Sequence, residues 1–203
     1  MAGAIFRKAV AEETGRTWEE WVRGLDQEVE VSWSHGQIAE YLSDAYGLSD
    51  VWRETLATMY ERQMGRKPVG VTASAGVQIG VRRTPPVAKE EAWRFLTSPE
   101  GLKLWIGKLS AFELQKGFKY ESKEGTFGEL RVVNPMDKLR MTWQRLDWDQ
   151  PSTLQIYLLS GGPGKTTVSF HQEKLEDLYM REVMKRHWEE VLDQMNERLN
   201  LTA

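Results

Sequence analysis

The hydrophobic periodicity of this chain changes near Pro68-Val69-Gly70, and no other feature constrains the fold as much. Before this point, apolar residues recur at the three- and four-residue spacing of amphipathic helices. After it, short runs alternate apolar and polar residues, as half-buried strands do. The change predicts a small all-helical domain over residues 1–68 and a second, strand-rich domain over residues 71–203.

Helix start signals divide the first domain. Thr17 and Ser34 each stand three residues before Glu20 or Gln37, which is the spacing of a capping box. A further apolar stripe at helical spacing follows Ser49. We therefore expect three or four short helices packed on tryptophans.

The second domain shows a different order of elements. Two helical stripes lie near 87–96 and 98–105, and a long apolar stripe indicates a helix over 178–199. Short separators between the strand-like runs predict antiparallel pairing, since parallel crossovers need longer connections. The fold class is therefore α+β, with a curved sheet of seven antiparallel strands wrapped on the long C-terminal helix. The seven runs are 77–81, 109–114, 118–122, 126–133, 139–146, 153–159 and 166–172.

Composition excludes several classes of function. The chain has 27 Lys and Arg against 30 Asp and Glu, so its net charge of −3 gives no basic field for nucleic acid. Residues 1–68 hold 8 basic and 12 acidic side chains, which argues against a DNA-binding helix-turn-helix there. Cysteine is absent, so disulfides and thiolate chemistry are excluded. No apolar run is long enough to span a membrane, and we expect a cytoplasmic protein.

Two apparent chemical motifs fail on their spacing. The segment 160–166 ends in Gly-Lys-Thr, but residue 159 is Leu where a phosphate-binding loop needs glycine, and a strand follows instead of a helix. A hairpin turn is expected there. His171 and Glu173 share one strand face but lack a third ligand, so we expect no metal site and no cofactor.

Strand alternation and the last helical stripe together predict a cavity. Leu139, Met141 and Trp143 fall on one face of their strand, which should be turned toward the long helix. A cavity between sheet and helix would be lined by Trp93, Trp105, Met141, Trp143, Met184, His187 and Trp188. The alternative is that these side chains simply fill the core. His187 is ambiguous in the same way, because it either packs with a backbone carbonyl partner or contacts a ligand.

Several segments resemble a known family. They include 92–102, with Ala-Trp-Arg-Phe-Leu-Thr-Ser-Pro-Glu-Gly-Leu, then 134–139, with Asn-Pro-Met-Asp-Lys-Leu, and 188–193 near the end. In order and spacing they are similar to the START/SRPBCC, or helix-grip, superfamily, in the branch named after the activator of heat shock protein 90 ATPase. The resemblance covers about residues 71–200. Residues 14–47 resemble a small helical domain of unknown function that often precedes this branch.

The resemblance implies a binding module that holds a small hydrophobic ligand, of lipid or aromatic type, between the sheet and the C-terminal helix. One alternative is an enzyme of cyclase, dehydratase or hydrolase type that uses a pocket His, with His187 as the first candidate. Another is a cochaperone-like protein with a chaperone partner. No nucleophile and base pair is visible in the sequence, so we assign no catalytic residue. Nothing in the sequence indicates the oligomeric state or the ligand.

Overall fold

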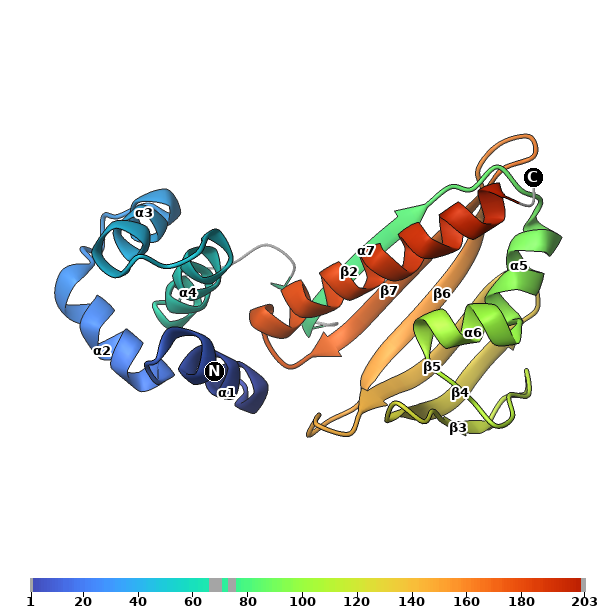
Figure 1. Ribbon diagram of the computed structural model, residues 1–203, viewed down its shortest axis with the longest axis horizontal. Helices are drawn as coiled ribbons and strands as arrows, with labels where there is room; N and C mark the ends of the chain where they lie inside the picture. The colour runs from blue at the N-terminus through green and yellow to red at the C-terminus, as the bar shows by residue number, and fades with distance from the viewer. Residues whose placement is uncertain (1, 66–70, 73–75, 202–203) are drawn as a thin grey trace.

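The computed structural model describes residues 2–65, 71–72 and 76–201. Its first part is a bundle of four helices, at the blue end of the chain in Figure 1. They are α1 (Ala4–Thr14), α2 (Trp18–Glu28), α3 (His35–Tyr46) and α4 (Asp50–Gln63). Both predicted capping boxes form, at Thr17 with Glu20 and at Ser34 with Gln37. The predicted domain boundary at 68–70 lies outside the described residues.

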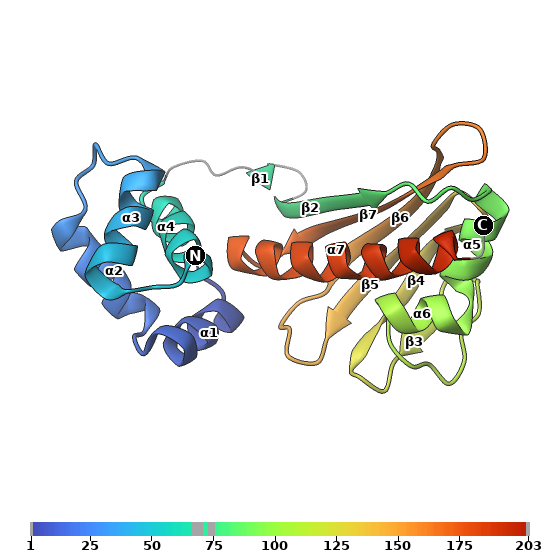
Figure 2. The ribbon, with the colours of Figure 1, turned by 45° about the horizontal axis from the view of Figure 1, so that its top comes forward.

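The second part is an antiparallel sheet with three helices. Its helices are α5 (Lys89–Thr97), α6 (Pro99–Trp105) and α7 (Leu178–Asn200), and its strands are β1 (Val71–Thr72), β2 (Gly76–Arg83), β3 (Lys119–Glu121), β4 (Thr126–Asn134), β5 (Lys138–Arg145), β6 (Ser152–Ser160) and β7 (Thr166–Leu175). The strand order is β1-β2-β7-β6-β5-β4-β3. α7 runs lengthwise along the sheet, with α5 and α6 beside its C-terminal half (Figures 1 and 2). The predicted α+β class is confirmed.

The predicted count of seven strands is wrong for this sheet, which has six strands of three or more residues. The run 109–114 forms no strand, and its only ladder contact is an isolated bridge between Leu109 and Ser122. Phe112 instead packs its ring on Trp105 and Phe118, so aromatic contacts hold this segment where strand pairing was expected. A two-residue pairing, β1, extends the sheet beside β2.

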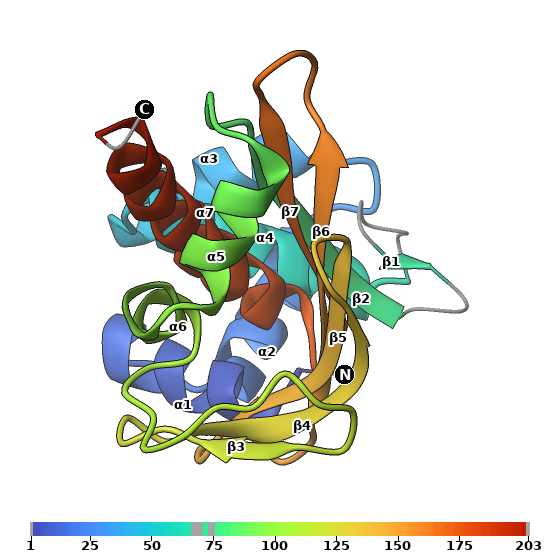
Figure 3. The ribbon, with the colours of Figure 1, turned by 90° about the vertical axis from the view of Figure 1, so that its right-hand side faces the viewer.

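The sheet curves around α7, and its concave face carries the core (Figure 3). Leu139, Met141 and Trp143 are buried on this face, as their alternation predicts. Simple alternation from Leu130 would turn Val132 inward as well, but the register shifts between Leu130 and Val132. This bulge turns Val133 toward the core in place of Val132.

The helical bundle contacts the first turns of α7. Asp177 caps α7 by accepting a hydrogen bond from the Met180 N–H at 2.8 Å, and its other oxygen accepts one from the Gly3 N–H at 2.9 Å. The Tyr179 ring stacks on Trp52 at 5.8 Å. The bundle is therefore attached to the start of α7 by both polar and aromatic contacts.

No helix among the described residues is long and apolar enough to cross a membrane.

Candidate functional site

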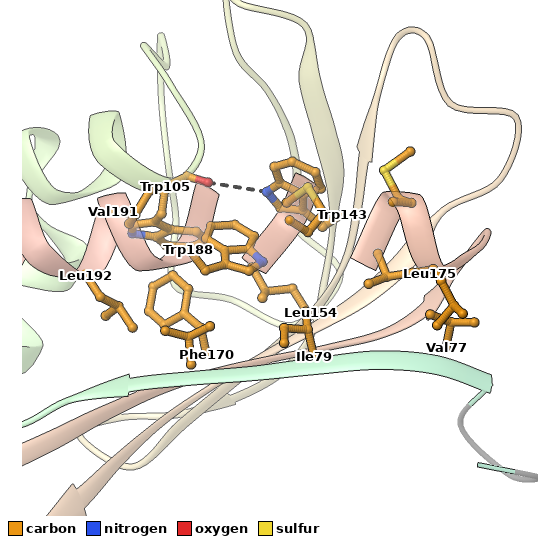
Figure 4. Close-up of a cluster of buried hydrophobic side chains, with 14 of the residues drawn as sticks. Val77, Ile79, Trp105, Trp143, Leu154, Phe170, Leu175, Trp188, Val191 and Leu192 are labelled. Carbon is orange, nitrogen blue, oxygen red and sulfur yellow. Dashed lines mark hydrogen bonds between the residues drawn. The ribbon is translucent and has the colours of Figure 1, made fainter. Parts of the chain in front are cut away.

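A cluster of aromatic rings fills the space between the middle of α7 and the sheet. Figure 4 shows Trp105, Trp143, Trp188 and Phe170 gathered there, with the Trp143 indole N–H directed at the Trp105 carbonyl oxygen, 3.3 Å away. The Trp143 and Trp188 ring centroids are 5.4 Å apart, and those of Phe170 and Trp188 are 5.1 Å apart. All four rings are buried. The deep part of the space between α7 and the sheet is thus packed with side chains.

A chain of buried hydrogen bonds runs from the Trp188 ring to the main chain of Trp143. The Trp188 indole N–H donates to Gln172 Oε1 at 2.7 Å, and Gln172 Nε2 donates to Ser152 Oγ at 2.8 Å. The Ser152 hydroxyl in turn donates to the Trp143 carbonyl oxygen at 2.6 Å. Since a buried polar group without a partner is costly, this continuous chain favours one arrangement of the cluster.

A pocket of about 270 Å³ lies at the edge of the cluster. The C-terminal end of α6, the turn before β4, strand β5 and the middle of α7 enclose it. Its lining residues are Lys103, Leu104, Trp105, Ile106, Gly107, Glu124, Thr126, Trp143, Arg145 and His187. Tryptophan and aliphatic side chains therefore line one part of this small space, and charged and polar side chains line the rest.

The seven residues predicted to line a cavity separate into three groups. Trp105, Trp143 and His187 line this pocket. Met141, Met184 and Trp188 are fully buried in the packed core. Trp93 is half-buried on α5 and is not part of the lining.

His187 is the most unusual polar group of the pocket. Its Nε2 is buried and has no hydrogen-bond partner among the described residues. The imidazole lies 4.5 Å from the Trp188 ring and 6.1 Å from the Trp143 ring, measured between centroids. Burial, with a smaller contribution from the positive charge of Arg145, lowers the pKa of His187 to about 4. At neutral pH it is therefore an uncharged imidazole.

Arg145 and Glu124 also line the pocket, and sequence reasoning missed both. The Arg145 guanidinium carbon lies 5.4 Å from the centre of the Trp143 ring. Glu124 accepts a hydrogen bond from the Lys108 N–H at 2.8 Å. The alternation that places Leu139, Met141 and Trp143 inward, continued by two positions, indicates Arg145.

The rejected motifs have ordinary structural roles. Residues 161–164 form the turn between β6 and β7, as expected. His171 Nε2 lies 3.0 Å from Gln78 Oε1, and its Nδ1 lies 3.5 Å from Glu173 Oε1. Within the described part of the chain, no three His, Cys, Asp or Glu side chains are grouped to hold a metal ion.

A larger groove of about 710 Å³ lies between α4 and the start of α7. Several of its charged groups pair with one another. His35 contacts Glu61 through Nδ1 at 2.8 Å and Glu54 through Nε2 at 2.9 Å, and Arg181 pairs with Glu182. Burial opposes the charge on His35, but the hydrogen bonds to the two carboxylates outweigh it and raise the pKa of the imidazole. This groove holds a network of ion pairs between the helical bundle and the start of α7.

The curved antiparallel sheet, the long C-terminal helix and the pocket beside that helix define the helix-grip class of proteins. The sequence comparison identifies the branch. Residues 86–200, more than half of the chain, match the family described as Activator of Hsp90 ATPase homolog 1-like protein, and the chain belongs to this family. The comparison with curated proteins finds no match.

Solved structures share the same fold. DynU16, from the dynemicin biosynthetic locus, has a TM-score of 0.53 and 23% identity, over 60% of this chain and 46% of its own. The aligned part thus spans less than half of DynU16. CV1439 from Chromobacterium violaceum has a TM-score of 0.51 and 18% identity, over 61% of this chain and 96% of its own. CalU16 from Micromonospora echinospora has a TM-score of 0.51 and 18% identity, over 64% and 89%.

Proposed function

We propose that this protein binds a small, largely apolar molecule in the pocket beside α7, with His187 supplying a polar contact. The observation that carries the proposal is the small pocket that His187 lines together with Trp105 and Trp143, with the buried His187 Nε2 left without a hydrogen-bond partner among the described residues. A buried polar atom without a partner costs free energy, and a ligand that supplies the partner recovers it.

The size of the pocket limits the ligand. Ligand pockets usually measure roughly 300–1,000 Å³, and apolar cavities of roughly 150 Å³ hold benzene. At about 270 Å³, this pocket suits a single ring with a short substituent. A lipid chain of ordinary length would need the packed aromatic cluster to open. Of the two predicted ligand types, the geometry therefore favours the small aromatic one.

Binding is better supported than catalysis. A general base is usually oriented by a second hydrogen-bonding group. No carboxylate of the described residues pairs with His187, whose ring contacts are those with Trp143 and Trp188. A neutral imidazole in this setting is suited to holding a polar group of a ligand.

The test is a ¹⁹F NMR titration of 2-(4-fluorophenyl)ethanol, a neutral probe of suitable size. We expect the wild type to broaden and shift the fluorine signal saturably. Leu104→Trp should abolish this effect, because Leu104 lines the pocket and is only partly buried, so the larger ring fills the space. Leu159→Trp introduces the same ring on an exposed part of β6 and is the matched control. Equal binding by both variants would contradict the proposal.

A further inference from the structure

Arg145 forms no direct ion pair with a carboxylate of the described residues, although Asp147 lies nearby. The Arg145 side chain is partly buried against Trp143. Burial lowers the pKa of Arg145, as expected for a charge partly removed from water, and the negative charge of Asp147 opposes this shift only in part. A half-buried charge is normally paired. Among the described residues, Asp147 acts on Arg145 only through space, without a direct ion pair.

The charged side chains that line the pocket have a positive net charge. Lys103 and Arg145 contribute positive charge, Glu124 contributes negative charge, and His187 is neutral. The Glu124 carboxylate already accepts a hydrogen bond from the Lys108 N–H at 2.8 Å. The Glu124 carboxylate is therefore bound by the main chain of the loop after α6. The Arg145 guanidinium is left to pair with a ligand.

Resting on the proposed function, we infer that the ligand is a small aromatic carboxylate whose ring packs on Trp105 and Trp143 and whose carboxylate pairs with Arg145. The planar guanidinium matches a carboxylate through two parallel hydrogen bonds, a geometry that a lysine cannot offer. His187 lines the same pocket from α7 and donates or accepts one further hydrogen bond. The apolar ring of such a ligand would contact the two tryptophan side chains, and its carboxylate would supply the ion pair that Arg145 lacks.

A matched pair of probes tests the charge. 4-Fluorophenylacetate and 2-(4-fluorophenyl)ethanol have the same ring and differ in the carboxylate. We expect the wild type to bind the carboxylate at least about tenfold more tightly. Arg145→Gln should reduce this preference to less than about twofold, because the amide cannot pair with the carboxylate. Arg140→Gln removes an arginine from the same strand, away from the pocket lining, and should keep the full preference.

The outcomes separate this inference from the proposed function. If the alcohol binds and the carboxylate binds no better, the inference is wrong and the binding function stands. If folded wild type binds neither probe, both are wrong. Should Arg145→Gln fail to fold, Arg145→Lys keeps the charge and loses the planar fork, and the inference requires a reduced preference there as well.

Discussion

At the scale of single residues, His187 links the packing of the pocket to the pH dependence of folding. Its ordinary pKa of 6.5 falls to about 4 in the folded protein. Between these values the unfolded chain binds more protons than the folded protein, so stability falls as the pH decreases from about 6.5 to 4. The stabilisation is fully present above pH 6.5, where both states hold a neutral imidazole.

This linkage gives a prediction for His187→Leu. At pH 7 the variant should be as stable as the wild type or more stable, because the unpartnered Nε2 is gone. At pH 4.5 its advantage should grow by about 2 to 3 kcal/mol in free energy of unfolding, since the protonation penalty is removed. Urea denaturation at the two pH values measures this difference. His187→Gln keeps a polar group that does not titrate, and should show the same change with pH. An advantage that is equal at both pH values would contradict the assignment.

The sequence indicated some of these residues and not others. Trp105, Trp143 and His187 followed from alternation and a helical stripe, and they line the pocket. Whether they bind a ligand stays a prediction. Glu124 lies in a turn, where no periodicity assigns an orientation to a side chain. Arg145 continues the alternation of Trp143 at the end of its strand, where an arginine in sequence looks the same whether it lines a pocket or faces solvent.

At the scale of elements, regular periodicity predicted most of the fold. The helix expected at 178–199 is observed as Leu178–Asn200. The strand predicted for residues 109–114 is not observed, because a short apolar run does not distinguish a strand from a loop held by aromatic contacts. The bulge after Leu130 has no local signature, so the orientation of Val132 was not predictable from alternation.

The corner between α5 and α6 depends on a glycine. A Cβ added at Gly101 would collide with the carbonyl oxygen of Phe95, which is backbone and cannot turn away. We expect Gly101→Ala to lower the free energy of unfolding by about 1 to 3 kcal/mol. Gly36→Ala is the control, since a Cβ at Gly36 in α3 meets nothing within 4 Å and alanine favours helix. Thermal unfolding of both variants measures the contrast, and equal melting temperatures would refute this explanation of the corner.

At the scale of the whole molecule, Asp177 connects the helical bundle to the long C-terminal helix α7. It accepts hydrogen bonds from Met180 on its own helix and from Gly3, 174 positions earlier in the chain. A contact between such distant residues leaves no local pattern, so the sequence predicted two domains without predicting how they meet. The cap itself had a signal, because Asp stands directly before the apolar stripe of α7.

Removing the Asp177 carboxylate should destabilise both the start of α7 and the attachment of the N-terminal segment at Gly3. Asp177→Ala loses a helix cap and leaves the Gly3 N–H without its acceptor, so we expect a loss of about 2 kcal/mol in free energy of unfolding. Hydrogen exchange should also become faster in α1. Glu176→Ala is the adjacent control, because its hydrogen bond from the Ala4 N–H is exposed and longer, at 3.2 Å. Unchanged exchange in α1 of the Asp177 variant would show that Gly3 does not depend on this contact.

The central claim is that a small ligand binds beside α7, in the pocket of Trp105, Trp143 and His187. Amide and indole ¹H–¹⁵N spectra, recorded during titration with 2-(4-fluorophenyl)ethanol, test it most directly. We predict that the indole N–H signal of Trp143 and the amide signal of Gly107 shift saturably, while the indole signal of Trp52, which stacks on Tyr179 at the start of α7, stays in place. Shifts confined to Trp52 and its neighbours in α4, or no saturable shift at all, would contradict the claim.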